Sequence, residues 1–85
     1  MEKFMLVEFT RKTGKITKTL EGYGQALLKL YALQNLTKTR DAILFNKETG
    51  EVITYFEGNG SFPKVIDGNG ENIEDYCEGL LEVNR

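Results

Sequence analysis

Two stretches of the chain alternate apolar and polar residues, turn at a glycine, and alternate again. Residues 3–10 lead through one turn into residues 15–20, and residues 41–45 lead through another into residues 52–56. Alternation with a period of two is typical of β-strands. Glycine readily adopts the positive φ that closes a short bulged hairpin. The pattern therefore predicts two antiparallel hairpins.

The two hairpins also resemble each other in sequence at a constant offset of 36 positions. Phe9 coincides with Phe45, and Gly14 coincides with Gly50. The remaining identical pairs are Thr13/Thr49, Glu21/Glu57, Gly22/Gly58 and Gly24/Gly60. The length of 85 residues fits one domain. The sequence therefore predicts a single domain, 1–85, with an internal pseudo-repeat of residues 4–36 and 40–83.

Two segments have the apolar spacing of helices. The first follows Gly24 to about Leu36 and is apolar nearly all round, whereas a surface helix normally has one apolar stripe. The second begins after Asn72, a favourable N-cap residue. Its single stripe consists of Ile73, Tyr76, Cys77, Leu80, Leu81 and Val83. We expect the first helix to be covered on two sides, by the sheet and by either the second helix or another chain.

This order of elements predicts an α+β fold, in which two ββα units give a mainly antiparallel four- or five-stranded sheet with two helices packed on one face. Residues 62–66 form the optional fifth strand, and Pro63 would confine it to an edge. The inward-pointing Lys18 places the first return strand at an edge. Residues 52–56 are apolar on both faces, which favours a central position. The predicted inner side consists of Val7, Phe9, Ile16, Leu20, Ile43, Phe45, Val52 and Phe56.

The outer side of this sheet carries further apolar side chains. If the helices cover only the inner side, these residues form an exposed patch large enough to indicate a partner. The predicted partner-binding residues are Phe4, Leu6, Leu44, Ile53 and Tyr55, together with Leu28 of the first helix. The alternative is that residues 59–70 or the second helix fold over the patch.

Composition argues against catalysis. The chain has no histidine, so the usual general base near neutral pH is missing. The one cysteine, Cys77, lies on an apolar stripe and is expected to be an inert core residue. We expect no enzyme activity, no cofactor and no metal centre. No signal peptide or membrane-spanning run is visible, so a cytoplasmic location and no membrane association are expected. Such a chain is compatible with the short accessory proteins of bacteria.

Two charged segments provide alternative functions. Basic residues gather at the first hairpin tip, where they could follow a phosphate backbone: Arg11, Lys12, Lys15 and Lys18. The sequence pI of about 5.1 and the absence of interleaved aromatic residues weigh against nucleic acid. Residues 67–78 place oxygen ligands at the spacing of a calcium loop, but Asn72 replaces its usual glycine. A Gly/Asn-rich loop before an acidic first helical turn explains the same residues.

The sequence thus predicts a small non-enzymatic interaction or regulatory domain. It would bind a protein partner, or a second copy of itself as a homodimer, through an apolar sheet face and helix surface. Nucleic-acid binding by the first hairpin is the alternative, and calcium binding at residues 67–78 is a minor one.

Overall fold

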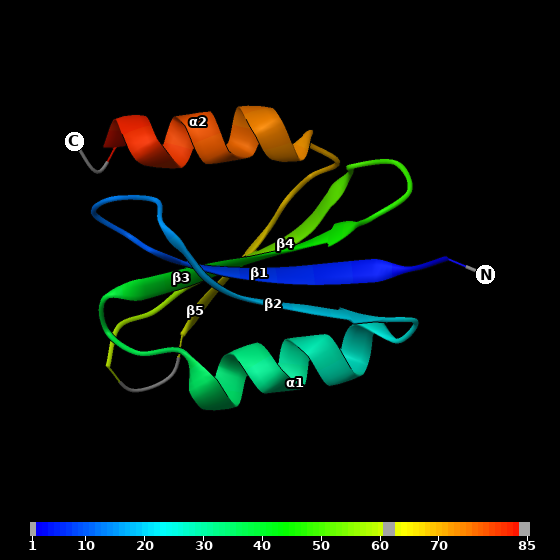
Figure 1. The fold of residues 1–85 in the computed structure, drawn as a ribbon, viewed down its shortest axis with the longest axis horizontal. Coiled ribbons are helices and arrows are strands. Elements are labelled where there is room, and N and C mark those ends of the chain that lie inside the picture. Colours follow the sequence, from blue (N-terminus) through cyan, green and yellow to red (C-terminus); the bar gives the residue numbers. More distant parts are fainter. Residues whose placement is uncertain (1, 61–62, 84–85) are drawn as a thin grey trace.

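The computed structural model describes residues 2–60 and 63–83, and it has five strands and two helices (Figure 1). In chain order the elements are β1 (Phe4–Thr10), β2 (Ile16–Gly22), α1 (Gln25–Asn35), β3 (Arg40–Asn46), β4 (Val52–Glu57), β5 (Lys64–Asp67) and α2 (Ile73–Val83). The strands form one antiparallel sheet in the order β2-β1-β3-β4-β5. The predicted α+β class and mainly antiparallel sheet are confirmed, and of the four or five strands predicted the sheet has five.

The edges of the sheet lie where the sequence predicts them. β2 is one edge and β5 is the other, while β4 is paired on both sides. β5 begins directly after Pro63, which has no amide proton for a ladder. The central strands β1 and β3 pair with each other along their whole length, from Phe4 opposite Asn46 to Thr10 opposite Arg40.

The two hairpin turns have the same backbone geometry. The Gly14 amide donates to the carbonyl of Thr10, and the Gly50 amide donates to that of Asn46, both at 2.7 Å. The φ angles of the glycines are 69° and 78°, in the left-handed region that side chains with a Cβ disfavour. The residue type at these two positions therefore fixes where each hairpin closes.

Each return strand contains a β-bulge that the alternation pattern does not reveal. Thr17 in β2 and Ile53 in β4 are left without a partner residue in their ladders. A bulge moves the following residues to the other face. Leu20 and Phe56 consequently lie on the α1 side of the sheet, opposite to the predicted inner side. Ile16, which precedes the bulge in β2, is 59% exposed.

The prediction that both helices pack on one face is wrong. Figure 1 shows the sheet between the two helices, with α1 on one side and α2 on the other. α1 packs through Leu28, Ala32 and, just after its end, Leu36. α2 packs through Ile73, Tyr76 and Cys77 against a second cluster on the opposite face. Leu80, Leu81 and Val83 of the predicted stripe lie outside the described side chains.

Burial on both faces of the central strands explains this arrangement. On β3, Ala42 and Leu44 face α1, whereas Ile43 and Phe45 face α2, and all four are buried. A sheet that is apolar on both sides needs a cover on each side. α1 follows β2 directly, whereas α2 follows the additional strand β5. α2 covers the face that α1 leaves open.

Candidate interaction surface

The predicted apolar patch is part of the core. Phe4, Leu6 and Leu44 are between 0% and 6% exposed and form one cluster with Leu28 under α1. Leu28, itself predicted as a contact residue, is 7% exposed and faces the sheet. The expected exposure of these four residues is therefore wrong, because α1 covers the sheet face that the sequence left bare.

The last two predicted contact residues lie on opposite faces. Ile53 occupies the bulge and is half-buried against the α1 cluster. Tyr55 is buried on the α2 side, where its ring centroid lies 5.3 Å from that of Tyr76. Burial and a hydrogen bond to Asp41 raise the pKa of Tyr55 well above its ordinary value. Neither residue contributes to an open apolar surface.

Exposed apolar side chains instead gather on the outer side of α1. Leu27 is 75% exposed and Leu30 is 49% exposed. Tyr31, one turn after Leu27, reaches strand β2, where Lys18 Nζ donates to its hydroxyl group. Residues four apart lie on the same side of a helix. Leu27 therefore lies on the flank of α1 that faces the sheet edge formed by β2.

Beside this flank runs the open edge of the sheet. β2 is seven residues long, and its side chains from Ile16 to Thr19 are exposed. We call Leu27, Leu30, Tyr31 and the edge strand β2 together the α1–β2 surface. The helical wheel already separates Leu27 and Leu30 from the buried Leu28. The sequence does not show which side of α1 faces the sheet, so it did not identify which leucines would be exposed.

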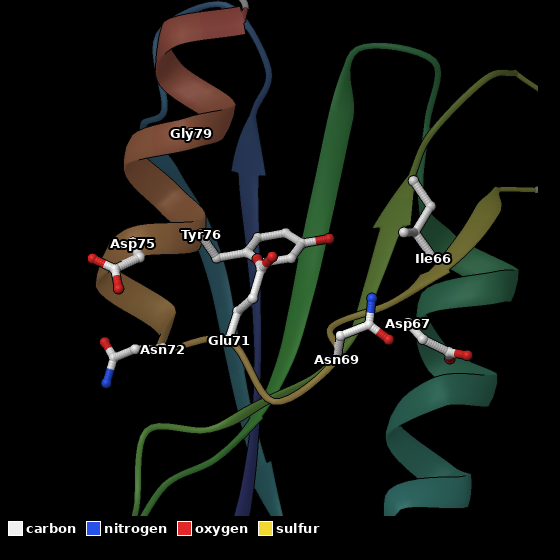
Figure 2. A pocket seen from close by; sticks show the side chains of 8 residues that line it. All are labelled: Ile66, Asp67, Asn69, Glu71, Asn72, Asp75, Tyr76 and Gly79. Carbon is white, nitrogen blue, oxygen red and sulfur yellow. The ribbon is translucent and has the colours of Figure 1, made fainter.

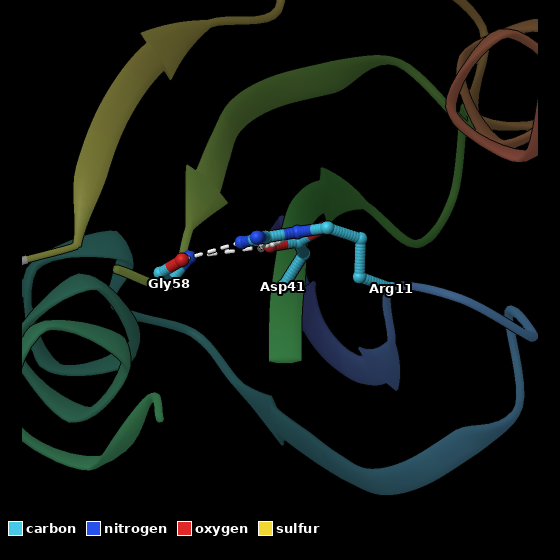
Figure 3. Close-up of polar contacts among 3 residues, drawn as sticks. All are labelled: Arg11, Asp41 and Gly58. Atoms are coloured by element: carbon cyan, nitrogen blue, oxygen red, sulfur yellow. Dashed lines mark hydrogen bonds and ion pairs between the residues drawn. The ribbon is translucent and has the colours of Figure 1, made fainter. Parts of the chain in front are cut away.

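Arg11 of the basic hairpin is committed to an internal contact (Figure 3). Its guanidinium Nη2 lies 2.7 Å from Oδ1 of Asp41, and its Nε donates to the same carboxylate. Arg11 also donates to the carbonyl of Gly58, whose amide donates to Asp41 at 3.1 Å. Asp41 is fully buried, and no buried side-chain nitrogen or oxygen lacks a partner among the described residues. This contact joins β1, β3 and β4 at one end of the sheet.

Two of the four predicted nucleic-acid residues are thus occupied elsewhere. Arg11 pairs with Asp41, and the ammonium group of Lys18 lies over the Tyr31 ring, 4.9 Å from its centroid. Lys12 and Lys15 remain exposed at the hairpin tip. The nucleic-acid hypothesis now rests on these two lysines.

The predicted calcium loop borders an open hollow of about 640 Å³ between β5 and α2. Figure 2 shows Tyr76 and Glu71 directed toward its centre, whereas Asp75 points away on the outer side of α2. Among the described residues, no three His, Cys, Asp or Glu side chains come together in a way that could hold a metal ion. Burial raises the pKa of Tyr76 to about 12, with a further contribution from the negative charge of Glu71.

An apolar cleft of about 420 Å³ lies on the α2 side of the sheet, next to the first hairpin. Its described lining residues are Val7, Phe9, Gly14, Ile16, Phe45, Ile73 and Cys77. Burial raises the pKa of the Cys77 thiol, which disfavours the reactive thiolate. Cys77, predicted to be a core residue, is half-buried against the α2-side cluster.

In the part of the chain that the structure describes, neither helix has the length and apolar character required to cross a membrane. Comparison with protein-family models, with curated proteins and with solved structures finds no match to this chain.

Proposed function

We propose that the protein is a small non-enzymatic interaction domain that binds another protein chain through the α1–β2 surface. The observation that carries the proposal is the exposure of Leu27 and Leu30 on α1, with Leu27 on the flank next to the open edge strand β2. Isolated exposed leucines are ordinary, but apolar residues beside unpaired backbone groups offer two attractions to one partner.

The surface favours a partner that presents an extended segment. A strand added to β2 would satisfy the outward backbone N–H and C=O groups, and its side chains would reach the flank of α1. Burial of Leu27 and Leu30 would supply the hydrophobic part of the binding free energy. The sequence predicted an apolar binding surface on the sheet face. The surface proposed here lies instead on the outer side of α1 and the adjacent sheet edge.

Site-specific photocrosslinking tests this proposal. A benzophenone amino acid replaces Leu27 in one variant and Val65, an exposed residue of the opposite edge strand, in a control. We expect a discrete crosslinked protein from position 27 in cells, and its loss when Leu30→Glu is added. Identical crosslinking patterns from positions 27 and 65 would contradict the proposal.

A further inference from the structure

We propose that the partner on the α1–β2 surface is a second copy of the chain, joined through antiparallel pairing of the two β2 strands. This inference rests on the proposed function, because it names the occupant of the same surface. The paired strands would continue the two sheets into one, with a twofold axis perpendicular to the sheet.

The two sheet edges differ in their protection. β5 has only four residues and follows Pro63, both of which are common ways to blunt an edge. β2 has seven residues and no proline. It contains a bulge at Thr17 and one inward-pointing charge, Lys18. The ammonium group of Lys18 is held over α1, where it donates to the Tyr31 hydroxyl group and lies over the Tyr31 ring. The ammonium group therefore does not screen the outward backbone of β2.

The regular part of β2 fixes the register of the pairing. Residues 18–22 pair without interruption with β1, and the bulge at Thr17 precedes them. A twofold axis perpendicular to the sheet keeps opposite residues on one face, so the axis passes through a residue position. An axis at Leu20 pairs residues 18–22 with residues 22–18 of the copy and leaves Thr17 outside.

This register also suits the charges of the strand. It places Leu20 opposite its own copy on the α1 side, Thr19 opposite Glu21, and Lys18 opposite Gly22. No charge meets a like charge, and the Glu21 carboxylate opposite Thr19 is already neutralised by Lys3 and Lys47 of its own chain. An axis at Lys18 would instead oppose two ammonium groups directly. β2 is therefore complementary to itself in the register centred on Leu20.

The same axis keeps both α1 helices on one side of the extended sheet. Leu27 and Tyr31 lie on the flank of α1 next to β2, so they would face the corresponding flank of the second copy. Exposed apolar area would then be removed from water on both chains. The α2 helices would lie together on the opposite side.

Two measurements on the purified full chain test this inference. Sedimentation equilibrium should show a monomer–dimer transition, with the dissociation constant raised at least about tenfold by Leu27→Glu. In a Cys77→Ser background, Leu20→Cys should form an intermolecular disulfide under mild oxidation, because opposite Cβ atoms in a sheet lie about 4.5–5.5 Å apart. Val65→Cys on the other edge is the matched control.

The outcomes separate the inference from the proposed function. Rapid crosslinking at position 20 together with a dimer supports it. A monomer at every concentration, or equal crosslinking at positions 20 and 65, overturns it. If the chain is monomeric but position 27 still crosslinks a different protein in cells, the inference falls and the proposed function stands.

Discussion

At the scale of single residues, the contact of Arg11 with Asp41 shows how position changes the meaning of a charge. In the sequence Arg11 belongs to a basic hairpin tip, and Asp41 begins a strand 30 residues later. In the structure the carboxylate is fully buried, and it accepts from the Arg11 guanidinium and the Gly58 amide. A buried carboxylate needs such partners, because its desolvation is costly.

Removing the arginine should therefore reveal this cost. We expect Arg11→Met to lower the free energy of unfolding by about 3 kcal/mol, because the buried Asp41 carboxylate loses its cationic partner. The neighbouring exposed Lys12→Met should change it by less than about 0.5 kcal/mol. Urea unfolding followed by circular dichroism measures both.

The double variant Arg11→Met/Asp41→Asn provides the control for this interpretation, because it also removes the buried charge. It should recover part of the loss caused by Arg11→Met alone. Equal stabilities of the Arg11→Met and Lys12→Met variants would show that the pairing contributes nothing.

Gly58 has a steric role in the same contact. A Cβ atom at this position would lie 1.9 Å from the carbonyl oxygen of Thr37 and 2.3 Å from that of Arg40. Backbone atoms at this distance must move. Gly22 and Gly58 coincide in the two similar hairpin sequences, but their surroundings differ. A Cβ atom at Gly22 would meet nothing within 4 Å.

A pair of alanine substitutions tests this difference. We expect Gly58→Ala to destabilise the fold by at least about 2 kcal/mol because of the backbone clash. Gly22→Ala should have a small effect. Thermal unfolding of the two variants makes the comparison, and similar melting temperatures would contradict the tight packing around Gly58.

At the scale of elements, the sequence predicted which strands and helices exist, and their order, better than it predicted the sheet face to which their side chains point. Both hairpins, both helices and the edge strands follow from periodicity and from the glycine positions. The side on which the strand residues after Thr17 and Ile53 point does not follow, because each bulge inserts one residue into an otherwise regular alternation. The candidate surface was misplaced for a different reason: Phe4, Leu6 and Leu44 lie on the sheet face that α1 covers.

Two adjacent leucines of α1 test its orientation. Leu28 is buried against the sheet, whereas Leu27 is 75% exposed. We expect Leu28→Ala to cost about 2–5 kcal/mol of unfolding free energy, as for other buried leucines. Leu27→Ala, measured at low protein concentration where association is negligible, should cost less than about 0.5 kcal/mol. A reversed order would mean that the other side of α1 faces the sheet.

At the scale of the whole molecule, α2 and the sheet enclose two tyrosines whose protonated forms are favoured. Burial raises the pKa of Tyr55 above its ordinary value of 10.0 and that of Tyr76 to about 12. The unfolded chain therefore releases these protons at lower pH than the folded chain. The resulting stabilisation is complete below about pH 10 and is lost as the pH rises through the folded values.

We accordingly expect the free energy of unfolding to fall above about pH 10, by up to about 1.4 kcal/mol per pH unit for the buried Tyr55 and by less for the half-buried Tyr76, whose charge water screens. Tyr55→Phe should reduce this slope, because phenylalanine has no proton to release. Denaturant unfolding at several alkaline pH values provides the measurement. An unchanged slope in the Tyr55→Phe variant would show that other groups cause the alkaline loss.

The strand order also has a consequence for the path by which the chain folds. Four ladders hold the sheet, and three of them join consecutive strands through short connections. The ladder between β1 and β3 instead spans the hairpin return and α1, so its closure has the largest entropy cost. We expect the two hairpins to form early and independently, and the β1–β3 ladder to form in the folding transition state. Substitutions at the β1–β3 seam should therefore slow refolding in stopped-flow measurements, whereas substitutions in β5 should mainly accelerate unfolding.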